Sequence, residues 1–268
     1  MAEAARRPVV LVGCGRLGSA ILEGWLNTDA VEAAELIILT PSDKPAAEIA
    51  RRRGARINPP LEALSEARVV VLAVKPAKWR EASQPLIPHL PDDAVIVSVM
   101  AGVRADALGD ALSPLRVARV MPTTAVAQAQ GVAAIWAADA TARQTARGLF
   151  SPLADIVDLE EEGAIDVATA VAGSGPAYVH AFTRALAEAG RASGLDADSA
   201  LRLARGALRS ATAADPADSL DDLIARVASP GGTTEAGLKA LNDGQALDRA
   251  VAAAVAAALG RARELSRD

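Results

Sequence analysis

The sequence predicts an α/β fold in which a doubly wound sheet is followed by an all-helical second part. Short apolar runs alternate with helical patterns up to about residue 158, and such runs are typical of parallel strands buried on both faces. Beyond that residue the strand signals stop, and apolar residues recur only at helical spacing. We therefore predict a sheet domain over residues 1–160 and a helical domain over residues 161–268.

The composition argues against several classes of function. Aromatic residues make up only 2% of the chain and the formal net charge is -5, so we expect neither nucleic acid nor a membrane as a partner. Cys14 is the only cysteine, and the two histidines, His89 and His180, are far apart. An internal disulfide is therefore excluded, and a metal centre is not expected. Because no apolar signal region precedes the first strand, we expect a cytoplasmic protein.

A glycine-rich turn follows the first predicted strand. The strand, Val9–Val12, is wholly apolar, and Leu17, Ile21 and Trp25 recur at helical spacing after the turn. A strand, a GxGxxG turn and a helix in this order are typical of a Rossmann-type dinucleotide site. The first glycine makes the turn, the second lets the pyrophosphate approach the backbone, and the third lets the helix pack closely on the strand. The residues expected to bind the cofactor here are Gly13, Cys14, Gly15, Arg16, Leu17 and Gly18.

The end of the second predicted strand, over 36–40, bears on which cofactor binds. In sites that prefer NADH, an acid near this end holds the ribose 2′-hydroxyl. No acid stands at the tip of this strand, and Thr40, Ser42 and Lys44 are placed to contact a 2′-phosphate instead. The sequence therefore favours NADPH, with NADH as the alternative because Asp43 lies nearby. A different interpretation is that Ser42 and Asp43 cap the helix that follows.

Two further apolar strands, predicted over 69–74 and 94–99, end at the same crevice. The carboxyl ends of parallel strands line the cofactor site of such a sheet, and small residues there let a ring pass closely. For Lys75 two interpretations are open: a contact with a phosphate or with the substrate, or a side chain that projects into solvent. Strands are also expected over 115–120 and 131–136. The cofactor contacts expected in this region are Ala73, Val74, Lys75, Pro76, Met100, Ala101 and Gly102.

In the second part of the chain, apolar residues at helical spacing predict helices over 165–194, 196–214, 220–227, 233–241 and 245–265. The first of these is interrupted within Ala172–Tyr178 by two glycines and Pro176. Such residues cost a helix several kcal/mol, roughly, relative to alanine. The interruption therefore indicates close approach of a ligand or a second subunit, with a packing kink as the alternative.

A second turn, Ser229–Glu235, stands out in the helical part. Pro230 ends the preceding helix, Gly231 and Gly232 permit a tight turn, and a new helix begins at Thr233. A glycine turn that starts a helix leaves backbone N–H groups unpaired, and these suit a small anion such as a carboxylate or a phosphate. The alternative is an ordinary turn between two helices.

Taken together, these stretches resemble pyrroline-5-carboxylate reductase, an enzyme of proline biosynthesis, from Val9 to about Leu265. The most specific motifs are Ala-Gly-Ser-Gly-Pro-Ala-Tyr at 172–178 and Ser-Pro-Gly-Gly-Thr-Thr at 229–234. The resemblance implies an NAD(P)-binding domain followed by a helical domain that forms a homodimer or a larger assembly of dimers. It implies an active site at the dimer interface and the last step of proline biosynthesis, in which 1-pyrroline-5-carboxylate is reduced to L-proline.

The resemblance also implies roles for particular residues. A protonated imine is already electrophilic, so the mechanism requires no metal, and the protein has to hold two reactants about 3–3.5 Å apart. Backbone N–H groups of 232–234 are expected to bind the substrate carboxylate, and the Thr234 hydroxyl is expected to act as the catalytic group on the ring nitrogen. Glu162 either lines the site or is a surface acid. The residues expected at the substrate are Glu162, Thr169, Ser174, Gly175, Gly232, Thr233 and Thr234.

Two other interpretations stay open from the sequence. One is a β-hydroxyacid dehydrogenase or another imine reductase, although the helix over 166–192 has no lysine of the kind that hydroxyacid dehydrogenases use. The other is a redox sensor that binds NADPH without turnover. The chain departs from the family pattern at Thr123 and Ala125, at Leu61 (where an asparagine commonly contacts the adenosine side of the cofactor), and at Met100 and Ala172.

Overall fold

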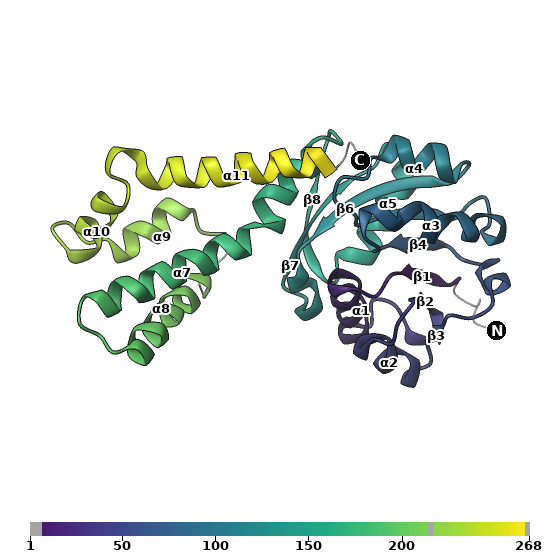
Figure 1. Cartoon of the computed structure of the whole chain (residues 1–268), viewed down its shortest axis with the longest axis horizontal. Helices are drawn as coiled ribbons and strands as arrows, with labels where there is room; N and C mark the ends of the chain where they lie inside the picture. The colour runs from purple at the N-terminus through teal and green to yellow at the C-terminus, as the bar shows by residue number, and fades with distance from the viewer. Residues whose placement is uncertain (1–6, 214–216, 266–268) are drawn as a thin grey trace. The chain divides into compact units, whose positions relative to one another are not determined.

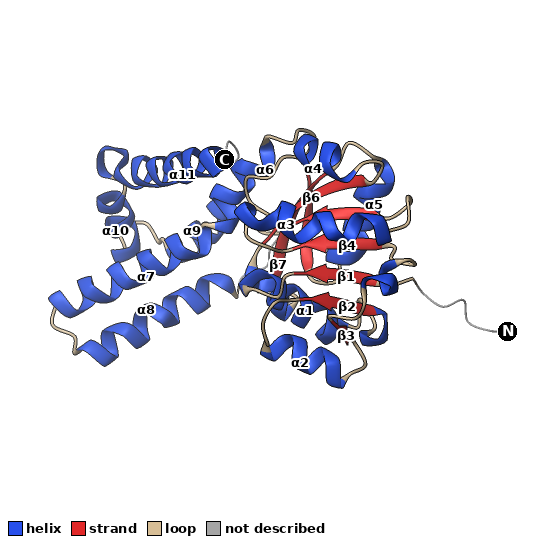
Figure 2. Cartoon of the chain, turned by 45° about the vertical axis from the view of Figure 1, so that its right-hand side comes forward, coloured by secondary structure: helices blue, strands red, loops and turns tan. Residues whose placement is uncertain are grey.

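The computed structural model describes residues 7–213 and 217–265 and contains one eight-stranded sheet. The strand order is β3-β2-β1-β4-β5-β6-β7-β8, and all neighbouring strands are parallel except β6 and β7, which are antiparallel. The order reverses between β1 and β4, which is where such sheets bind their ligands (Figure 2). The strands are β1 (Val9–Val12), β2 (Leu36–Leu39), β3 (Arg56–Ile57), β4 (Val69–Leu72), β5 (Val95–Ser98), β6 (Arg116–Pro122), β7 (Gly131–Trp136) and β8 (Ala154–Asp158).

The central strands β1, β4 and β5 are apolar apart from Ser98 at the end of β5, because helices cover both of their faces. Val9, Val69 and Val95 lie in register on one face, in the core formed with α1 (Arg16–Thr28), α2 (Pro45–Arg52) and α5 (Ala140–Phe150). Their neighbours Val10, Val70 and Ile96 lie on the other face, in the core formed with α3 (Trp79–Ser83) and α4 (Ala105–Leu112). This alternation follows from the two-residue period of a strand and confirms the predicted doubly wound sheet.

The described residues group by contact into two compact units. One holds the chain up to Gly173 and again from Ala258, and the other is Ser174–Ala257. The sheet, α6 (Ala164–Ala168) and a π-helix at Thr169–Gly173 belong to the first unit. A domain boundary near residue 160 stays a prediction. By contact, residues 161–173 group with the sheet.

The second unit is wholly helical, as the sequence predicts (Figure 1). Its helices are α7 (Gly175–Ala192), α8 (Ala197–Thr212), α9 (Leu220–Val227), α10 (Thr233–Leu241) and most of α11 (Ala246–Leu265). The predicted interruption of the first long helix is present, because the π-helix ends at Gly173 and α7 starts with Pro176 in its first turn. No helix within the described residues has the length and apolar character needed to cross a membrane.

Candidate active site

The three glycines of the first turn lie in different surroundings, and each has the environment that its predicted role requires. Gly13 has φ 95°, and a Cβ there would lie 2.7 Å from the carbonyl oxygen of Ala73. A Cβ at Gly18 would lie 2.2 Å from the carbonyl oxygen of Gly13. A Cβ at Gly15, by contrast, meets no described atom within 4 Å, so this side of the turn is open. Gly13 and Gly18 are therefore needed to close the turn, whereas Gly15 leaves room for a ligand.

The start of α1 offers backbone donors at this open side. Gly15 is the N-cap residue, and within the described residues no side chain caps the helix. The first N–H groups of a helix have no partner inside it and attract negative charge. These donors, together with the space above Gly15, fit the pyrophosphate of a dinucleotide.

A polar pocket of about 480 Å³ lies at the end of β2. Thr40, Ser42 and Lys44, the residues predicted to contact a 2′-phosphate, all line it. Lys44 is the N-cap residue of α2, and no described side chain caps that helix. The alternative in which Ser42 and Asp43 serve as caps is therefore wrong, which leaves both side chains available to the pocket.

Two residues of this pocket were missed by the sequence analysis. The Asn58 side chain accepts from the Thr40 amide at 2.9 Å and donates to the Thr40 carbonyl at 2.8 Å, so it pairs with the end of β2 as a neighbouring strand would. The Thr40 hydroxyl donates to the Ser42 carbonyl, which makes Thr40 a shaping residue. Arg51 brings a cation from α2, and its hydrogen bond to Glu48 raises the Arg51 pKa. A sequence signal for Arg51 was present. Arg51 follows Lys44 by seven residues, about two helical turns, so the two cations are expected on the same side of α2.

A less polar pocket of about 690 Å³ adjoins the first one at the point where the strand order reverses. It is bounded by the ends of β1, β2 and β4, and its lining includes Gly13, Leu39 and the predicted contact Val74. Leu61 also lines it. An apolar pocket beside a phosphate-binding turn suits the flat faces of an adenine ring.

The turn between β5 and α4 carries the predicted contacts Met100, Ala101 and Gly102. Gly102 has φ 77°, a conformation that glycine adopts at little cost. The Met100 amide donates to the hydroxyl of the buried Ser98 at 3.4 Å. The far end of the turn is held by Glu162, whose carboxylate accepts from the Ala105 amide at 2.7 Å, at the first residue of α4.

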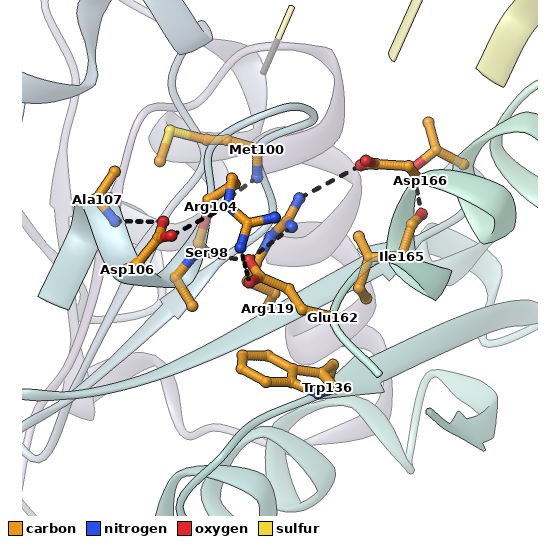
Figure 3. A network of polar contacts seen from close by, with 12 residues as sticks. Ser98, Met100, Arg104, Asp106, Ala107, Arg119, Trp136, Glu162, Ile165 and Asp166 are labelled. Carbon is orange, nitrogen blue, oxygen red and sulfur yellow. Dashed lines mark hydrogen bonds and ion pairs between the residues drawn. The ribbon is translucent and has the colours of Figure 1, made fainter. Parts of the chain in front are cut away.

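Glu162 is not a free surface acid. Its side chain is 12% exposed, and it accepts a hydrogen bond from Arg119 at 2.9 Å besides the one from Ala105. Arg104 pairs with its second oxygen at 3.3 Å. Figure 3 shows the two guanidinium groups beside this carboxylate, with Asp166 near Arg119. The sequence signal for this cluster is Arg119, an arginine in the buried, otherwise apolar part of β6.

The residues expected at the substrate belong to both units. Glu162 and Thr169 are in the first unit, where the Thr169 hydroxyl donates to the Ile165 carbonyl within the helix. In the second unit, Ser174 is the N-cap residue of α7. The Tyr178 hydroxyl donates to the Ala254 carbonyl at 3.4 Å, which fits a packing role for Tyr178.

The turn before α10 is the anion site that the sequence predicts. Gly231 has φ 71°, and its amide donates to the Glu235 carboxylate at 2.8 Å. Gly232 is the N-cap residue, and among the described residues no side chain caps this helix. A Cβ at Gly232 would lie 2.9 Å from the backbone carbonyl oxygen of Ser229, so the turn favours glycine there. Thr233 and Thr234 are the first residues of α10, so their N–H groups have no acceptor inside the helix, as the predicted binding of a small anion requires.

Comparison with known proteins decides the family. Residues 162–265 match the family described as pyrroline-5-carboxylate reductase dimerisation, and residues 8–102 match one described as NADP oxidoreductase, coenzyme F420-dependent. A pyrroline-5-carboxylate reductase of Pseudomonas aeruginosa is 34% identical over 96% of this chain and 96% of its own length. This chain belongs to the pyrroline-5-carboxylate reductase family.

Solved reductase structures agree with this assignment. A pyrroline-5-carboxylate reductase from Coxiella burnetii matches with a TM-score of 0.87 and 26% identity, over 97% of this chain and 98% of that chain. A Plasmodium falciparum pyrroline carboxylate reductase with NADP bound shares the fold, with a TM-score of 0.82 and 23% identity over 98% of this chain and 100% of that one. The family resemblance seen in the sequence is confirmed, whereas the roles of single residues stay predictions.

Proposed function

We propose that this protein reduces 1-pyrroline-5-carboxylate to L-proline with NADPH, as the last step of proline biosynthesis. The observation that carries the proposal is similarity over nearly the full length of a pyrroline-5-carboxylate reductase, with the dinucleotide turn and the turn before α10 both present. A hydroxyacid dehydrogenase and a non-catalytic redox sensor explain the first turn but not the second. The cytoplasmic location expected from the sequence stays a prediction.

The first unit binds and orients the dinucleotide. The N–H groups at the start of α1 take the pyrophosphate, and Ser42, Lys44 and Arg51 take the 2′-phosphate. When bound, the nicotinamide supplies the hydride that adds to C5 of the substrate imine. The Met100–Gly102 turn would hold that end of the cofactor, because its small residues let a ring approach the backbone.

The second unit binds the substrate. The N–H groups at Thr233 and Thr234 hold the carboxylate at the positive end of α10. The Thr234 hydroxyl makes no hydrogen bond within the described residues, so it is available to the ring nitrogen of the substrate. When the hydride adds to C5, the electron pair of the C=N double bond moves to that nitrogen. Ser174 and Gly175, small residues at the start of α7, shape the pocket without crowding the ring.

The dimerisation family match supports a homo-oligomer, and the surface of the second unit agrees with it. Several large apolar side chains are exposed in the single chain, among them Leu203 at 61%, Val227 at 67% and Leu220 at 77%. An apolar surface of this kind is covered in the functional protein, because leaving it in water is unfavourable. A second copy of the same helices covers it in the proposed dimer.

The proposal is tested by measuring the oxidation of NADPH and NADH with 1-pyrroline-5-carboxylate and, side by side, with related cyclic imines. We expect turnover of 1-pyrroline-5-carboxylate, with proline as the product and a higher kcat/KM for NADPH than for NADH. Tight NADPH binding without turnover would support the redox sensor. Faster reduction of another cyclic imine would move the protein to a different reductase activity.

The basic residues of the β2 pocket give a prediction about cofactor preference. Lys44→Ala and Arg51→Ala each remove a cation from the pocket. We expect each to raise the KM for NADPH about five- to tenfold, because the contact with the 2′-phosphate is charge-assisted but partly screened by solvent. The KM for NADH stays within about twofold. Arg52→Ala is the matched control, because Arg52 is on the same helix outside the pocket lining. A parallel rise in both KM values contradicts the assignment.

A further inference from the structure

The polar cluster under the β5–α4 turn holds a buried cation whose hydrogen bonds are incomplete. The Arg119 side chain is 2% exposed, and it lies beside Ser98 in the register of β6 with β5. Its Nη1 donates to Glu162, but its Nε and Nη2 are buried without a hydrogen-bond partner in the described part of the chain. Asp166 is 3.8 Å from Nη2, near enough for attraction but not for a hydrogen bond.

This arrangement is a poor way to gain stability. A buried guanidinium that keeps unpaired nitrogens loses hydration that its ion pairs do not fully replace. Replacing such a pair with apolar residues often leaves a protein as stable as before. The arrangement is therefore better explained by the positions in which it holds the neighbouring residues than by a contribution to the stability of the fold.

The neighbour that the cluster holds is the Met100–Gly102 turn, which in the proposed function contacts the nicotinamide. Glu162 connects Arg119 to the Ala105 amide and to Arg104, the residues at which that turn enters α4. The carboxylate also lies at the positive end of α4, which favours its charge there. The segment that carries Glu162 is itself tied to β7, because the Trp136 indole donates to the Glu160 carbonyl at 3.3 Å. Figure 3 shows the guanidinium groups of Arg104 and Arg119 beside the Glu162 carboxylate.

We propose that Arg119 and Glu162 are positioning residues for hydride transfer: they fix the amino end of α4 and thereby hold the Met100–Gly102 turn against the nicotinamide. This inference rests on the proposed function and goes beyond it, since neither side chain has to touch the substrate. Because the adenosine and 2′-phosphate pockets are formed by other elements, cofactor affinity should change less than the rate of transfer.

The test uses Glu162→Gln and Arg119→Lys, which retain side-chain size or charge but break the shared geometry. We expect kcat to fall about ten- to a hundredfold, the range that small misplacements of reacting groups produce. The KM for NADPH and its dissociation constant, measured by fluorescence titration, stay within about threefold. With 4-deuterated NADPH the isotope effect on kcat rises, because transfer becomes the slow step. In the protein without cofactor, amide hydrogen exchange over 99–105 becomes faster.

Asp106→Asn is the matched control. It makes the same acid-to-amide change at the same helix end, and Asp106 contacts Arg104 without contacting Arg119. We expect its kcat, isotope effect and exchange to match those of the parent.

Three results overturn the proposal. One is unchanged kcat and exchange in both folded variants, and another is a loss confined to NADPH affinity. The third is failure of both variants to fold, which would show that the pair serves stability. In each case turnover by the parent leaves the proposed reductase function standing, whereas a parent without turnover contradicts that function itself.

Discussion

Gly18→Ala lowers the free energy of unfolding by about 1–3 kcal/mol and abolishes measurable NADPH binding, because the added methyl group has no space. A Cβ at this position would lie 2.2 Å from the Gly13 carbonyl oxygen and 3.3 Å from the Ala73 side chain. Gly13 belongs to the turn and Ala73 directly follows β4, so the helix has to move away from the sheet. Thermal or urea unfolding measures the first effect, and fluorescence titration with NADPH measures the second.

Gly15→Ala is the matched comparison within the same turn. A methyl group there meets no described atom within 4 Å, and the backbone has φ -74°, which alanine adopts readily. We expect stability within about 1 kcal/mol of the parent, the usual range for exchanges at an N-cap, but at least a tenfold weaker affinity for NADPH, because the methyl group occupies the path of the pyrophosphate. Similar stability losses in the two variants, or normal NADPH affinity in Gly15→Ala, would refute the division of roles among the glycines.

Thr234→Ala reduces kcat/KM for 1-pyrroline-5-carboxylate about ten- to a hundredfold. A hydrogen bond to a charged group, or to a group on which charge develops, contributes about 1.5–3 kcal/mol. Each 1.4 kcal/mol of that energy corresponds to a factor of about ten in kcat/KM. The loss should appear mainly in kcat if the hydroxyl acts on the ring nitrogen during transfer, and mainly in KM if it only holds the substrate. Steady-state kinetics at saturating NADPH separates the two.

Thr234→Ser provides the control for this variant, since it keeps the hydroxyl and removes only a methyl group. We expect its kcat/KM to lie within about threefold of the parent. If Thr234→Ala itself stays within about twofold, the proposed role of the hydroxyl is wrong.

The parts of the fold that the sequence predicts are those in which local pattern and burial agree. The apolar run at Val69–Leu72 is buried on both faces, so its composition alone identifies a central strand. The helices of the second unit begin and end within a few residues of their predicted bounds, because Asp196, Pro230 and the glycines at 231–232 mark their ends.

The strands β3 and β8 were not predicted, for different reasons. β3 consists of two residues and exists only through its pairing with β2, so no periodic pattern is present. β8 is largely exposed and contains Asp155 and Asp158, so it lacks an apolar signature. The antiparallel direction of β7 was also missed, although the link over 123–130 is shorter than the dozen or so residues that a parallel crossover needs.

The candidate site divides in the same way. The glycine turns and the ends of the apolar strands are readable because backbone geometry and position in the chain determine their chemistry. The contacts of Asn58 with Thr40 and of Arg119 with Glu162 join residues that are far apart in the chain, and they arise only when the strands are in register. The sequence predicts Glu162 as a site residue, and its partners are visible only in the folded chain.

The central claim is that this chain transfers a hydride from C4 of a nicotinamide to C5 of a small cyclic imino acid. The most direct measurement is to supply NADPH with deuterium in place of both C4 hydrogens together with 1-pyrroline-5-carboxylate and to locate the label in the product by NMR. We predict proline with one deuterium at C5. Proline without the label, or label at any other carbon, would contradict the account.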